Sequence, residues 1–157
     1  MSEQAEALAA QFEQANNELI DVIEGCSDEQ WLSKCPGTGW SVGVTAHHVA
    51  LDTPLLAGMI GAVASGQSFP PLAIGGADKA NAQHAQEHAD CTKQETLDLL
   101  HREVPMAASL VLGLSDEQLA RTAEVLAGAP PLSAEHVIQG FLINHVTEHL
   151  KSIRAAS

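Results

Sequence analysis

Four long segments of the chain carry apolar residues at three- and four-residue steps, and this spacing limits the fold more than any other feature. The pattern predicts amphipathic helices over residues 3–24, 42–65, 93–112 and 133–154. Hydroxyl residues suited to cap a helix start each segment: Ser2, Ser41, Thr92 and Ser133. The period-two alternation that marks strands is missing, and only 3% of residues are aromatic. The predicted fold is therefore all-α, a four-helix bundle.

The stretches between the predicted helices divide the chain into two helix pairs. Residues 66–78 contain two consecutive prolines and a Gly-Gly pair, which predicts a long crossover between the second and third helices. The letters "SDEQ" follow both the first and the third helix, which indicates a repeated helix pair; such letters also open helices commonly, so chance is the alternative. A length of 157 residues predicts a single domain, 1–157.

The charge balance argues against several classes of partner. Seven Lys and Arg residues against 20 Asp and Glu give a formal net charge of -13, which would repel a phosphate backbone, so nucleic acid is not expected as a partner. The first residues lack the features of a signal peptide, and no stretch is expected to cross a membrane. Three cysteines without a CxxC pair fit reduced thiols. The chain is expected to be cytoplasmic.

A pair of histidines four residues apart, His145 and His149, stands in the last predicted helix, in "NHVTEHL". Positions four apart lie about 40° from each other around a helix, so both rings share one face. That face also carries apolar residues, namely Ile138, Phe141, Leu142 and Ile153. Imidazoles within a core stripe need polar partners, and one metal ion would serve both. Histidines bonded to side chains or water are the alternative, and the more common one.

A histidine doublet near the start of the second helix offers a further ligand. His47 and His48 point about 100° apart, on the two flanks of the apolar stripe, and spacing alone does not choose between them. Three neutral imidazoles from two helices, with one position left for water, make an open zinc-like site. A half-exposed pair is the alternative. Asp52, four residues after His48, has the right spacing to orient an imidazole, although a simple solvated carboxylate is the more common role.

The segment "GWSVGVTAHHVA" resembles the entry to the second helix in the DinB-like superfamily, also called YfiT-like metal-dependent enzymes. In that pattern a ligand histidine follows the Trp by eight residues, which here is His48. The final "HVTEHL" resembles the family's H-x-x-x-H, matching His145 and His149. The resemblance covers nearly the whole chain, and the added His47 departs from it. It implies a four-helix bundle, often dimeric, with a divalent metal on His48, His145 and His149.

The same resemblance implies a class of reaction. Relatives include mycothiol-dependent maleylpyruvate isomerases and bacillithiol or glutathione S-transferases, so we expect a metal-dependent S-transferase or isomerase in which a low-molecular-weight thiol attacks a small electrophile. Zinc or nickel is the first candidate for the metal, and mycothiol, bacillithiol or glutathione for the thiol. No residue stands out as the catalytic base. A non-catalytic metal or small-ligand binding module of stress response, or a metal-dependent hydrolase, is the alternative.

Other interpretations of the histidines are weaker. "HVTEH" also fits the protease pattern H-x-x-E-H, but the eight residues after His149 leave no room for the further ligand that such sites need. Glu148 is therefore expected beside the site or in solvent. The second i, i+4 pair, His84 and His88, lies among Ala, Gln and Glu with no apolar stripe, which predicts a solvated face.

The second helix is apolar on several sides, including Leu51, Leu55 and Met59. An apolar face outside the core is typical of an interface between chains. The sequence therefore predicts a homodimer.

Overall fold

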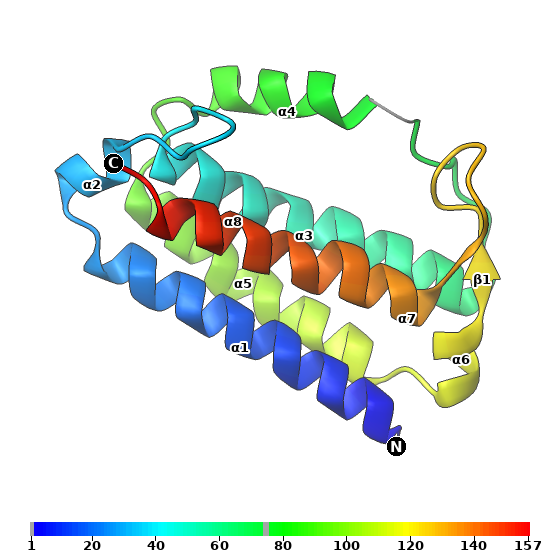
Figure 1. The fold of residues 1–157 in the computed structure, drawn as a ribbon. Helices are drawn as coiled ribbons and strands as arrows, with labels where there is room; N and C mark the ends of the chain where they lie inside the picture. The colour runs from blue at the N-terminus through cyan, green and yellow to red at the C-terminus, as the bar shows by residue number, and fades with distance from the viewer. Residues whose placement is uncertain (1, 74–75) are drawn as a thin grey trace.

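The computed structural model describes residues 2–73 and 76–157, and most of them are helical. The long helices are α1 (Glu3–Gly25), α3 (Val42–Ser65), α5 (Lys93–Leu112) and a C-terminal rod made of α7 (Ala134–Val137), a π-helical segment η1 (Ile138–Ile143) and α8 (Asn144–Arg154). These four rods lie side by side along their lengths (Figure 1). The predicted helical fold class is confirmed, and each predicted segment is helical.

The helix ends follow local chemistry. Each predicted capping hydroxyl accepts a backbone hydrogen bond from the first turn, and these caps are Ser2, Ser41, Thr92 and Ser133. At Gly66 the backbone turns left-handed, with φ of 73°, which ends α3 at little steric cost. Local sequence alone therefore accounts for where the long helices begin.

The repeated "SDEQ" letters have a structural counterpart. They form two short helices, α2 (Asp28–Leu32) and α6 (Asp116–Ala120), and each has a reciprocal capping box at its N-terminus. In α2 the box joins Ser27 and Gln30, and in α6 it joins Ser115 and Gln118. Each short helix follows one long helix, α1 or α5, as a pairwise division of the chain predicts.

Packing between the rods forms the apolar core. α1 packs against α5, α5 against α3, and α3 against α8. The largest side chains that are fully buried include Phe12, Leu19, Ile60, Leu100 and Ile138, so every rod contributes to the core. His48 lies on the side of α3 that faces α8, whereas His47 lies on the side that faces α4, so both polar rings stand at the edge of this core.

One small sheet interrupts the helices. β1 (Thr122–Ala123) and β2 (Leu132–Ser133) pair antiparallel, with Thr122 opposite Ser133. The expectation that no strand would interrupt the helices is wrong here. Two residues per strand are too few for a periodic signal, and the pairing satisfies backbone groups of the loop that joins α6 to α7.

The crossover between α3 and α5 holds a helix of its own. α4 (Gly76–Glu87) lies outside α3, across one side of the rods (Figure 1). The crossover was predicted to be irregular over residues 66–78, but its last three residues, 76–78, belong to α4. Residues 74–75 lie outside the described part of the chain. In α4 only His84 is buried, so apolar burial holds this helix weakly to the rest of the molecule.

Among the described residues, one helix is long and apolar enough to cross a membrane, and this is α3. That finding differs from the expectation that no segment has such a composition. In the structure α3 packs against α5 and α8, with Val49, Ile60 and Val63 buried in the core. Its apolar window is 44% buried inside the structure, while Leu51 and Leu55 are exposed.

Candidate metal centres

The three histidines expected to bind a metal lie together. His48 comes from α3 and His145 and His149 come from α8, and one ring nitrogen of each lies within 4.8 Å of the others. We call these three residues the first histidine cluster. Nε2 of His48 lies 2.9 Å from Nε2 of His145. Two nitrogens bound to one tetrahedral zinc ion lie roughly 3.3 Å apart, given zinc–nitrogen distances of about 2.0–2.1 Å, so a small movement would fit the cluster to an ion.

Burial keeps the first histidine cluster neutral. His48 is 3% exposed, and burial followed by the charge of His145 lowers its pKa to about 3. Burial, and then His149, lowers the pKa of His145 to about 4. Burial also lowers the pKa of His149, while Glu148 acts in the opposite direction. Because a metal binds the unprotonated ring, these shifts favour a metal at neutral pH.

A carboxylate stands beside the first histidine cluster. Oδ2 of Asp52 lies 3.5 Å from Nε2 of His48 and 3.6 Å from Nε2 of His145. Burial raises the pKa of Asp52 to about 6. A simple solvated carboxylate is therefore the wrong interpretation: Asp52 follows His48 by one turn, and the approach of α8 partly encloses both side chains. At this position Asp52 can orient the rings or exchange a proton near neutral pH.

The rod that carries His145 and His149 changes its helical pitch just before them. The π-helical segment Ile138–Ile143 leads directly into α8. Such segments occur often at functional sites, where they alter the face that the following residues present. Gly140 and Phe141 of this segment also line the cavity beside the histidines, so η1 shapes one wall of the site.

A cavity of about 700 Å³ opens onto the first histidine cluster. This volume is within the usual range for small-molecule sites, roughly 300–1,000 Å³. Asp52 and Glu148 also line the cavity, and Glu148 is exposed to solvent. The larger apolar side chains in the wall are Leu56, Leu72, Leu126 and Phe141. The three histidines and Asp52 therefore stand in the wall of a largely apolar cavity that is large enough for a small molecule.

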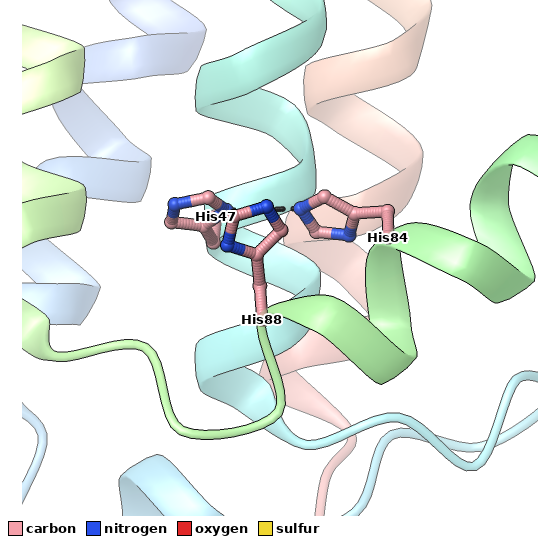
Figure 2. Close-up of side chains that lie close together, drawn as sticks. All are labelled: His47, His84 and His88. Atoms are coloured by element: carbon pink, nitrogen blue, oxygen red, sulfur yellow. Dashed lines mark hydrogen bonds between the residues drawn. The ribbon is translucent and has the colours of Figure 1, made fainter.

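A second group of histidines was not expected. One ring nitrogen each of His47, His84 and His88 lies within 4.8 Å of the others (Figure 2). The prediction of a solvated face for His84 and His88 is wrong, because His84 is only 8% exposed. Its neighbours in α4 offer no apolar stripe, and the residue that it faces, His47, belongs to α3. The repeated i, i+4 spacing and the doublet at 47–48 were the available signals.

The structure is a helical protein with two groups of three histidines that could each hold a metal ion. Sequence comparison identifies its family. The chain belongs to the DinB superfamily, whose family model matches residues 11–153. The resemblance seen in the motifs is therefore confirmed. No curated protein matches this sequence closely enough to count as a relative.

A solved structure extends the comparison of folds. The crystal structure of a mycothiol-dependent maleylpyruvate isomerase superposes with a TM-score of 0.75 over 98% of this chain, at 11% sequence identity. This chain spans 63% of the length of that enzyme's chain. At such low identity the likeness shows a shared fold.

Proposed function

We propose that the chain is a divalent-metal-dependent enzyme that joins a low-molecular-weight thiol to a small electrophile, as an S-transferase or a thiol-dependent isomerase. His48, His145 and His149 would hold the metal. The observation that carries this proposal is the convergence of three buried or half-buried ring nitrogens, within 4.8 Å of one another, at an apolar cavity. When bound, a divalent ion supplies the positive charge that keeps a thiol in its reactive thiolate form at neutral pH.

The chain's own residues have distinct tasks in this proposal. Asp52 would accept the thiol proton at Oδ2, because this oxygen lies 3.5 Å from Nε2 of His48 and 3.6 Å from Nε2 of His145, beside the position proposed for the metal. The apolar wall, including Leu56 and Phe141, would hold the carbon skeleton of the electrophile and exclude water. Glu148 would lie near the cavity mouth, where it can interact with a polar part of either reactant.

The cofactor and partners follow from the same chemistry. Zinc and nickel are the first candidates, since both accept imidazole ligands. Mycothiol, bacillithiol and glutathione are the candidate thiols, and the structural likeness to a mycothiol-dependent isomerase supports this group. The partners would be a small-molecule substrate and the thiol, with no nucleic acid and no membrane, in the cytoplasm.

The test is a thiol-dependent turnover assay. Protein loaded with zinc or nickel is given chlorodinitrobenzene or maleylpyruvate, together with each thiol in turn. We expect turnover with one thiol, and a loss of at least about 100-fold in His48→Gln and in His145→Gln. His101→Gln is the matched control, because His101 is exposed on α5 and belongs to neither histidine cluster.

Two other outcomes would replace the proposal. No turnover with any thiol, despite stoichiometric metal, would favour a non-catalytic metal or small-ligand binding module. Hydrolysis of esters or amides without added thiol would favour a metal-dependent hydrolase, because the metal would then activate water.

We also propose that the four rods form a four-helix bundle in a single domain and that the chain is a homodimer. Leu55 on α3 is 69% exposed and Leu51 is 37% exposed, so α3 presents apolar side chains outside the core. Light scattering should give twice the chain mass of 16.5 kDa. A monomer at micromolar concentration would contradict the dimer.

A further inference from the structure

We propose that His47, His84 and His88 form a second binding site for a divalent transition metal, which fastens α4 to α3. The three residues, which we call the second histidine cluster, share no member with the first histidine cluster. The proposal does not depend on thiol chemistry at the first histidine cluster.

The geometry of the second histidine cluster suits one shared ion. Nδ1 of His47 lies 2.9 Å from Nε2 of His84. The ring centres of His47 and His88 are 4.4 Å apart, and those of His84 and His88 are 4.7 Å apart. Figure 2 shows the three rings gathered between α3 and the end of α4. Nitrogens on a tetrahedral zinc ion lie roughly 3.3 Å apart, so the closest pair needs to open by only a few tenths of an ångström.

Burial leaves this cluster with polar atoms that need a partner. His47 is 5% exposed and His84 is 8% exposed. Nδ1 of His84 is buried, and the described residues give it no hydrogen-bond partner. A buried imidazole nitrogen without a partner is unfavourable, and rotation of the ring toward a bound cation would satisfy it.

The electrostatic surroundings favour a cation. Burial, followed by the charge of His88, lowers the pKa of His47. Burial, followed by His47, lowers the pKa of His84 to about 4. Glu95 and Glu87 lie close enough to raise these pKa values in part, so negative charge is at hand to balance an ion.

The position of the cluster gives the metal a structural task. α4 is a 12-residue helix whose single buried side chain is His84, and such a short helix is marginal unless tertiary contacts hold it. His84 and His88 come from the C-terminal end of α4 and the turn after it, whereas His47 comes from α3. A metal on all three would cross-link the crossover to the rods.

A metal in the second histidine cluster would also affect the proposed reaction site, because α4 forms part of its cavity wall. α4 lines the same cavity as the first histidine cluster, through Gly76, Ala77, Ala80 and Asn81. The ring centre of His84 lies 5.5 Å from that of His48. A metal in the second histidine cluster would therefore hold one wall of the substrate cavity in place.

Zinc stoichiometry and hydrogen exchange test the proposal. After equilibrium dialysis against zinc, the wild-type chain should hold one ion for each cluster, and His88→Gln should hold one ion fewer. His88 is half-buried, so this substitution should leave the fold intact, and circular dichroism checks that it does. His101→Gln is the control and should bind as much zinc as the wild type.

Exchange in residues 76–88 gives the second measurement. Zinc should slow amide exchange there by at least about tenfold in the wild type, and equally in a His145→Gln/His149→Gln variant, but not in His88→Gln. Unchanged zinc content in His88→Gln, or zinc-independent exchange in α4, would overturn the second site. Loss of zinc only in the His145→Gln/His149→Gln variant would overturn it while leaving the first site standing.

Discussion

Replacing Gly43 by alanine should destabilise the protein, because an indole ring occupies the space that a side chain would need. Gly43 is near the start of α3, and a Cβ placed there would meet Nε1 and Cε2 of Trp31 at 2.5 Å. Trp31 is 7% exposed, and its Nε1 donates a hydrogen bond to the backbone oxygen of Cys91 at 3.0 Å. The ring can make room only by leaving this packed position.

The expected change in the free energy of unfolding combines two destabilising effects and one stabilising effect. Overpacking of a core position costs about 1–3 kcal/mol, and loss of the indole hydrogen bond costs roughly 1 kcal/mol. Replacing glycine by alanine in a helix returns at most about 1 kcal/mol. The net destabilisation of Gly43→Ala is therefore about 2 kcal/mol, which for a chain of this size corresponds to a Tm lower by about 4–8 °C.

A second glycine of the same helix provides the control. Gly58 is exposed, and a Cβ there would meet nothing within 4 Å. Gly58→Ala should therefore raise the Tm, by about 2–4 °C, through helix propensity alone. Thermal unfolding followed by circular dichroism measures both variants. A Gly43→Ala protein as stable as the wild type, beside a stabilised Gly58→Ala, would refute the packing argument.

The same substitution should weaken the second histidine cluster. The indole of Trp31 bonds to Cys91, three residues after His88, so it helps to hold the turn at the end of the crossover. Lys93 donates a further hydrogen bond to the backbone oxygen of Cys26 nearby. A displaced indole should loosen this turn and raise the zinc concentration needed to protect α4 from exchange, which the hydrogen-exchange assay measures.

Three further predictions concern pH, metal removal and the carboxylate. The metal-free protein should lose stability as pH falls from 6.5 toward 4. The pKa values of His48, His84 and His145 are lowered in the folded state, so the unfolded chain binds protons more readily in this range. Urea unfolding at pH 7.5 and at pH 5 measures the change, and equal stability at both values would contradict the prediction. Asp52 acts in the opposite sense, since its raised pKa of about 6 adds stability as pH falls toward 3.8, so Asp52→Asn should steepen the loss. Chelation of zinc held at 100 times its Kd should lower stability by about 2.7 kcal/mol and the Tm by roughly 5–10 °C in a thermal scan, and an unchanged Tm would argue against tight binding. Asp52→Asn should also reduce thiol turnover by about 10–100-fold while zinc content stays constant, and a parallel loss of zinc would show that Asp52 serves the metal instead.

The sequence by itself determined the local structure of this protein. Capping hydroxyls such as Ser41 and Thr92 define helix starts, because the hydrogen bonds that they make reach only three residues along the chain. The face shared by His145 and His149 follows from helix geometry in the same way. The choice of His48 over His47 for the first histidine cluster needed a family pattern, since local spacing did not distinguish them.

Tertiary structure decided which polar groups from distant parts of the chain came together. His84 has polar neighbours in sequence and is buried because α4 lies against His47 of α3, and no periodicity within α4 contains that information. Asp52 likewise lies beside His145 because α8 packs against α3. Helix formation depends on residues a few positions apart, whereas burial and metal-binding geometry depend on which distant segments pack together, so they emerge only when the chain has folded.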